Sequence, residues 1–169
     1  MKPLRYLVPA ALMIGAVIAC NKNNDTTTDL RVRLTDNPYD AVEVNVDIQQ
    51  VRVNFQDDST GWVNLDTRAG IYNLLDFQNG IDTLIAQTTV PTGTVKEVRF
   101  VLGSQNSIKI ANTVYPLTIP SGSESGLKIK LNKHLNAHVD SLVIDFDAAL
   151  SILQTGTGEY KLKPVLKIK

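Results

Sequence analysis

The apolar residues of this chain recur at every second position along much of its length, and this alternation constrains the fold most. The clearest segment, residues 42–49, reads VEVNVDIQ, with valine or isoleucine at each even-numbered position. Successive side chains of a β-strand point to opposite faces, so such a segment buries one face and exposes the other. The pattern predicts a chain built from strands.

The alternation changes phase after residue 49. Val51, Val53 and Phe55 occupy odd-numbered positions, and the polar pair Gln49-Gln50 separates them from the preceding run. One extra residue in a strand, a β-bulge, moves all later side chains to the opposite face. We therefore predict a bulge at Gln49-Gln50, which returns the second half of this strand to the core.

Similar alternation or short apolar runs, bounded by turn residues, predict the other strands. They lie at residues 30–35, 62–65, 81–89, 95–102, 107–110, 113–119, 127–131, 141–147 and 160–168. Only residues 148–153 favour a short helical turn. About nine or ten short strands without a long helix predict an all-β fold, specifically an antiparallel β-sandwich.

The first twenty residues have the architecture of a signal peptide. Lys2 and Arg5 precede an uncharged apolar run of thirteen residues, 7–19, and small Ala19 stands directly before Cys20. The run is shorter than the roughly 20 residues that a membrane-spanning helix needs. The sequence around Cys20 is similar to a bacterial lipobox, in which the cysteine thiol receives diacylglycerol and the chain is cleaved before the cysteine.

Cys20 is the only cysteine, so it cannot form an internal disulfide in an exported protein. Two or three acyl chains would hold a domain on a membrane, since each buried methylene contributes roughly 0.8 kcal/mol. The alternative is a secretory signal in which Cys20 is incidental. We predict a signal peptide over residues 1–19, the lipidated cysteine and a polar tether over 20–29, and one β-sandwich domain over 30–169.

The mature chain is close to neutral. Without residues 1–19 it has 150 residues, with fifteen Lys and Arg against seventeen Asp and Glu. This length suits a single domain with a sizeable core. Domains that bind nucleic acid are normally strongly basic, so the composition argues against nucleic acid as a partner. The membrane, reached through the lipid, is the partner that the sequence indicates.

Several sequence motifs follow one another in a characteristic order. They are LTDNPYD, GWVNL, YNLLDFQNG, VPTG with KEVRFVLG, YPLTIPSGSESGLKI, VIDFDAALSI and YKLKPVLKI. In this order they resemble the lipoprotein family known as domain of unknown function 4382, over residues 30–169. The resemblance implies an exported lipoprotein of a kind widespread in Bacteroidetes, with a transthyretin-like or prealbumin-like Greek-key β-sandwich. It implies no catalytic residues.

Aromatic and hydroxyl side chains are the candidates for ligand binding. Trp62 and Tyr115 could stack on a sugar ring, although aromatic residues of a sandwich also pack in its core or rim. The loop PSGSESG brings Ser121, Ser123 and Ser125 together, either to bind a ligand or simply to connect two strands.

Four aspartates are the candidates for a metal site. If the turn after residue 35 lies beside the DFD strand, Asp36, Asp40, Asp145 and Asp147 could supply oxygen ligands to calcium. The alternative is that Asp36 caps a turn and that Asp145 and Asp147 face solvent. No calcium-loop motif is present.

Two further groups have a functional and a structural interpretation. His134 and His138 lie four residues apart, which on a helix suits zinc, but their strand context favours a solvated loop. The lysines of the predicted strand at 127–131, with Lys133, and those of the last strand could face acidic glycans or lipopolysaccharide. Edge strands also carry lysines because these discourage pairing with other chains.

No motif of a common enzyme class is present: the sequence lacks GxSxG, HExxH and a phosphate-binding glycine loop. We therefore predict that the chain is not an enzyme. It is expected to be an outer-membrane lipoprotein, on the periplasmic face or the cell surface, that binds or scaffolds other molecules without a cofactor beyond its lipid. The alternatives are a surface glycan-binding accessory protein and a metal-dependent hydrolase.

Overall fold

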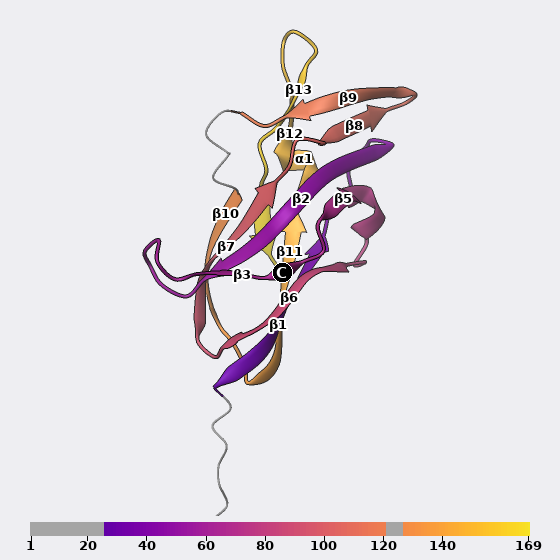
Figure 1. Cartoon of the computed structure of the whole chain (residues 1–169). Coiled ribbons are helices and arrows are strands. Elements are labelled where there is room, and N and C mark those ends of the chain that lie inside the picture. The colour runs from indigo at the N-terminus through magenta and orange to yellow at the C-terminus, as the bar shows by residue number, and fades with distance from the viewer. Residues whose placement is uncertain (1–25, 121–126) are drawn as a thin grey trace, which may run out of the picture.

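Two mixed β-sheets pack face to face as a β-sandwich (Figure 1). The computed structural model describes residues 26–120 and 127–169, so Cys20, Ser121, Ser123 and Ser125 lie outside the described residues. Within these ranges the chain forms fourteen strands, one 3-10 helix and one four-residue α-helix. The predicted all-β sandwich is confirmed.

The first sheet has five strands in the order β14, β11, β1, β6, β4. Their bounds are Leu166–Ile168, His138–Phe146, Thr27–Thr35, Thr83–Pro91 and Asp66–Thr67. β1 begins three residues before the predicted start of the strand at Leu30. β1 and β11 run parallel, from Thr28 opposite His138 to Thr35 opposite Asp145. The antiparallel prediction is wrong for this pair, because strands so far apart in sequence are not constrained by a hairpin.

The second sheet has nine strands. Seven follow one another as β10 (Leu127–His134), β7 (Thr94–Leu102), β2 (Glu43–Asn54), β8 (Ser107–Ile110), β9 (Thr113–Thr118), β13 (Tyr160–Leu162) and β12 (Ile152–Gln154). The other two, β3 (Trp62–Asn64) and β5 (Gly70–Asn73), also pair with β2. β13 and β9 form a second parallel pair, again contrary to the antiparallel prediction.

The predicted bulge in β2 is confirmed. The register against β7 shifts between Ile48, opposite Leu102, and Gln50, opposite Val101. Beyond the shift, Val51 and Val53 are fully buried, as is Ile48 before it. The bulge therefore keeps both halves of the longest strand on the core side.

The core lies between the sheets and forms one cluster of buried side chains. Val53 and Phe100 of the nine-stranded sheet and Leu34 and Ile144 of the five-stranded sheet are all fully buried. Burial of such a side chain contributes about 1.5–3 kcal/mol, so these alternating positions supply the main driving force for the fold.

Two short helices connect strands. Directly after β5, the chain forms the 3-10 helix η1 (Leu74–Phe77), which Asn73 caps by accepting from the Leu75 N–H. The predicted helical turn after residue 147 is α1 (Ala148–Ser151). No helix within the described ranges is long and apolar enough to cross a membrane.

Candidate functional site

An open recess lies where the chain crosses between the two sheets. β3 pairs with β2, β4 then pairs with β6 in the other sheet, and β5 returns to β2. The pairing with β5 ends at Ile48 and the pairing with β3 begins at Arg52, so the bulge residues Gln49 and Gln50 have no strand partner on that edge. The crossing segment thus leaves a gap beside the bulge.

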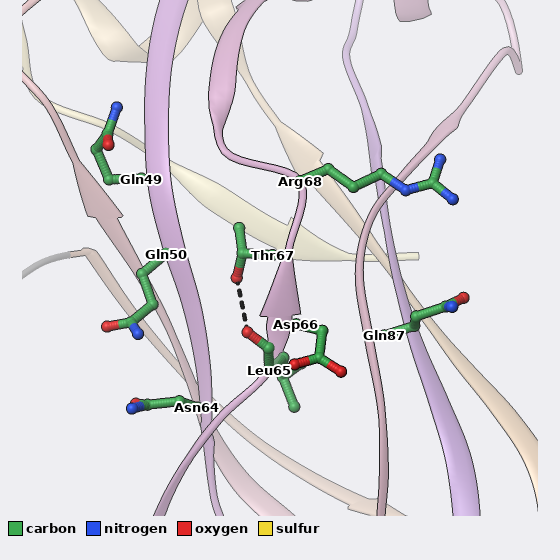
Figure 2. Close-up of a pocket in the computed structure, with 8 residues that line it drawn as sticks. All are labelled: Gln49, Gln50, Asn64, Leu65, Asp66, Thr67, Arg68 and Gln87. Carbon is green, nitrogen blue, oxygen red and sulfur yellow. Dashed lines mark hydrogen bonds between the residues drawn. The ribbon is translucent and has the colours of Figure 1, made fainter.

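The recess has a volume of about 620 Å³ and a polar lining. Its lining residues are Gln49, Gln50, Asn64, Leu65, Asp66, Thr67, Arg68 and Gln87. Figure 2 shows their side chains on both sides of the crossing segment: Arg68 and Gln87 extend to one side, and Gln50 and Asn64 to the other. Leu65 is the one apolar residue among them, and it is buried.

Much of the hydrogen-bonding capacity of this lining is unused. Among the described residues, the side chains of Gln50, Asn64, Arg68 and Gln87 form no hydrogen bond, whereas Thr67 donates to the Leu65 carbonyl at 3.0 Å. A primary amide both donates and accepts, and an arginine offers five donors. The recess can therefore bind a ligand rich in hydroxyl groups.

Trp62 does not line the recess and is engaged with two arginines. The Cζ atom of Arg99 is 4.0 Å from the centroid of the Trp62 ring, and that of Arg52 is 5.5 Å away. These are cation–π distances. Tyr115, the other predicted aromatic, lies on β9 at the far end of the sheet (Figure 1), where its ring is 5.0 Å from that of Tyr160. The structure does not bring the two predicted aromatic residues together.

Three of the four predicted aspartates lie close together, where the turn after β1 meets the end of β11 and the start of α1. Asp36, Asp145 and Asp147 are at most 4% exposed, whereas Asp40 is exposed. The Asn37 Nδ2 atom donates to Asp145 Oδ2 at 2.9 Å and lies 3.4 Å from Asp147 Oδ2. The turn after residue 35 thus lies beside the DFD strand, which was the condition for the calcium hypothesis. The alternative of solvent-facing Asp145 and Asp147 is wrong, because the turn and β14 cover them.

These carboxylates are largely satisfied by the protein itself. Asp36 Oδ1 accepts from the Ala148 N–H at 2.9 Å. The Lys167 ammonium donates to Asp147 at 2.7 Å, and the Lys169 ammonium lies 3.4 Å from Asp145. Within the described ranges, no three His, Cys, Asp or Glu side chains are grouped so that they could hold a metal ion. The cluster joins the turn, α1 and β14.

Burial changes the pKa of one carboxyl group in this cluster, that of Asp36. It raises the pKa of Asp36 to about 6, with a smaller contribution from the nearby charge of Asp145. Hydrogen bonds from the Ala148 N–H and the Gln78 amide oppose this rise but do not cancel it. Asp36 is therefore the group of this cluster that changes charge close to neutral pH.

The two histidines do not form a pair on one helix. His134 ends β10 in one sheet and His138 begins β11 in the other, and both are exposed. The Nδ1 atom of His134 lies 3.4 Å from the Thr94 hydroxyl. The segment therefore does not form the helix on which a spacing of four residues would suit zinc.

The predicted lysine patch is divided between the two sheets. Lys167 belongs to β14 and Lys169 follows that strand directly; they contact Asp147 and Asp145, respectively. Lys128 and Lys130 lie on β10, an edge strand of the nine-stranded sheet, opposite Arg99 and Glu97 of β7. Their neighbours Arg52 and Arg99, which the sequence interpretation missed, can be identified only when the strand register is known.

Comparison with known proteins identifies the family of this chain. No curated protein and no solved structure matches this chain. A family model described as "Domain of unknown function (DUF4382)" matches residues 27–164, which is nearly the whole described domain. The chain therefore belongs to the DUF4382 family, whose function is unknown.

Proposed function

We propose that this chain is a cell-envelope lipoprotein whose β-sandwich is a non-catalytic binding module for hydroxyl-rich ligands such as glycans. The observation that carries the proposal is the recess beside the β2 bulge, in which the side-chain amides of Gln50, Asn64 and Gln87 form no hydrogen bond with any described residue. Such groups match the alternating donors and acceptors of sugar hydroxyls.

The character of the recess favours binding over chemistry. Hydrolysis of a glycosidic bond normally needs two carboxyl groups, one as an acid and one as a base or nucleophile. Asp66 is the one carboxylate among the lining residues. The recess is also open, which suits a long polymer better than a small substrate that must be shielded from water.

The sequence supports an anchor close to the domain. Cys20 follows a signal-peptide pattern, and six residues, 21–26, or seven Cα–Cα steps, separate it from the start of β1 at Thr27. A chain of that length spans at most about 25 Å. The Thr26 carbonyl accepts from the Thr92 N–H at 2.8 Å, so the tether would leave the domain beside the turn between β6 and β7.

Binding can be tested with the full chain purified in a neutral detergent. We expect isothermal titration against neutral polysaccharides to give saturable binding, and Gln50→Ala and Gln87→Ala each to weaken it by about 3- to 10-fold, as expected for one lost hydrogen bond. The matched control is Gln154→Ala, an exposed glutamine on β12. Equal effects of all three substitutions would contradict a site in the recess.

The anchor has a separate test in the host cell. We expect Cys20→Ser to move the protein from the membrane fraction to the soluble fraction, because the thiol that carries the lipid is lost. Protease shaving and antibody labelling of intact cells then distinguish the cell surface from the periplasmic face. Membrane retention of Cys20→Ser would contradict the anchor.

A further inference from the structure

A row of positive charges crosses the outer face of the nine-stranded sheet, which is the face turned away from the other sheet. Arg52 of β2 lies directly opposite Arg99 of β7, and Arg99 lies directly opposite Lys128 of β10. We call these three residues the cationic row. Neighbouring strands are about 4.8 Å apart, so the three side chains start close together.

Within residues 26–120 and 127–169 the row has no counter-ion. None of its three members forms an ion pair with any described residue, and the Nε atoms of Arg52 and Arg99 are buried without a hydrogen-bond partner. Glu97 lies in the next row, opposite Asn54 and Lys130, and no ion pair joins it to either arginine. Like charges directly opposite one another destabilise a sheet, and so do buried donors left unpaired.

Trp62 compensates this arrangement only in part. Its ring contacts the guanidinium of Arg99 at 4.0 Å and that of Arg52 at 5.5 Å. A cation–π contact stabilises the charge and holds the planar group in place, but it supplies no acceptor for the N–H groups. The Nη groups of both arginines form no hydrogen bond with any described residue, so the row offers oriented, unused donors of the kind that bind an oxyanion.

The row continues into the recess. Asn64 lines the recess and lies directly opposite Arg52, on the side away from Arg99. Gln50, two residues before Arg52 on the same strand, also lines the recess. A polymer seated in the recess can therefore extend across β2 and β7 and place its charged groups on the arginines.

We propose that the cationic row binds the carboxylate or sulfate groups of an acidic polysaccharide whose neighbouring sugar units occupy the recess. This inference rests on the proposed function and names its ligand class. The arginine forks pair with two oxygens of each anionic group, and Lys128 adds a third positive charge at the edge of the sheet. The recess supplies the contacts to hydroxyl groups.

A matched pair of polymers tests the inference on the full chain in neutral detergent. Polygalacturonate carries a carboxylate on each unit, and its methyl-esterified form has the same backbone without the charges. We expect Arg52→Gln and Arg99→Gln each to weaken polygalacturonate binding at least about tenfold, and to change binding of the esterified form by less than about twofold. Lys161→Gln, an exposed control on β13, leaves both unchanged.

The outcomes separate this inference from the function on which it rests. Loss confined to the arginine variants and the charged polymer supports the cationic row. If the arginine variants and the wild type bind polygalacturonate equally, the cationic row is not the anion-binding site. Binding of the esterified form would then still support the recess as a site for sugar hydroxyl groups. If neither polymer binds the wild type, both proposals are overturned.

Two controls protect the interpretation. Lys128 is exposed on an edge strand, so Lys128→Gln tests the row without touching the contacts of Trp62 and is expected to weaken binding about threefold or more. Vesicles of phosphatidylglycerol test a membrane surface as the anionic partner. Arginine-dependent binding of the vesicles without binding of polygalacturonate would overturn the polysaccharide in favour of lipid.

Discussion

The titration of Asp36 gives the clearest prediction for a single residue. Its carboxyl has a pKa of about 6 in the folded chain against the ordinary aspartate value of 3.8, so the folded chain binds the proton more tightly than the unfolded chain does. The contribution of Asp36 to the free energy of unfolding therefore rises as the pH falls from about 7 to about 4, by no more than about 3 kcal/mol.

Asp36→Asn should remove this dependence, because asparagine keeps an acceptor for the Ala148 N–H but does not titrate. Urea unfolding at several values between pH 4 and pH 7.5, for wild type and variant, measures the difference. Asp147 and Asp140 have lowered pKa values, so their stabilisation is lost only below this range. If the free energy of unfolding depends on pH equally in the variant and the wild type, the pKa of Asp36 is not raised in the folded chain.

Gly103 gives a prediction about steric fit. A Cβ atom at this position would overlap the carboxylate of Asp47, which is 3% exposed and accepts from the Gln105 N–H at 3.1 Å. The carboxylate cannot move away without losing that bond, so we expect Gly103→Ala to lower the free energy of unfolding by about 2–4 kcal/mol. Gly156→Ala, where no atom lies within 4 Å, is the control and should change it by less than about 1 kcal/mol.

At the scale of elements, Asp147, which directly follows β11, connects that strand to α1 and β14. One carboxylate oxygen caps α1 by accepting from the Leu150 N–H at 3.0 Å, and the other pairs with Lys167 of β14 at 2.7 Å. We expect Asp147→Ala to destabilise the domain by about 1–3 kcal/mol, since it removes the cap of α1 and the acceptor of the Lys167 ammonium. Asp147→Asn keeps the cap and should cost less. Thermal unfolding compares both with Asp57→Ala in an exposed loop.

The same elements show what alternation in a sequence can and cannot reveal. It identified the long strand β2 and its bulge, because burial of one face imposes a period of two on the residues themselves. It could not show that Asp145 is buried, since the face opposite the core is covered by a distant turn and by β14. The two residues of β4 are too few to show any period, yet their crossing between the sheets creates the recess.

At the scale of the whole molecule, the site depends on register between strands far apart in sequence. Trp62 was identified as an aromatic candidate from its residue type alone. Arg52 and Arg99 look like ordinary solvent-facing positions until the pairing of β2 with β7 places them opposite each other. Tyr115 is chemically as suitable as Trp62 but lies at the other end of the sheet, a separation that no local pattern encodes.

The position of β1 gives a final prediction about folding. It is the central strand of its sheet, with β6 on one side and β11 on the other, and its pairing with β11 joins segments near the two ends of the domain. When strands far apart in sequence pair, the chain loses a large amount of entropy before the new contacts stabilise it. A chain truncated after Ala137 lacks β11 and all later elements, and it leaves Leu30, Val32 and Leu34 of β1 without their neighbouring strand on one side.

We therefore expect that truncated chain to be unfolded by circular dichroism and rapidly digested by protease. The matched comparison removes only residues 166–169, which deletes β14, an edge strand with three paired residues. That variant should fold cooperatively at a lower melting temperature, because β1 keeps both neighbours. A protease-resistant core in the chain ending at Ala137 would show instead that β1 and β6 fold with the nine-stranded sheet before β11 joins them.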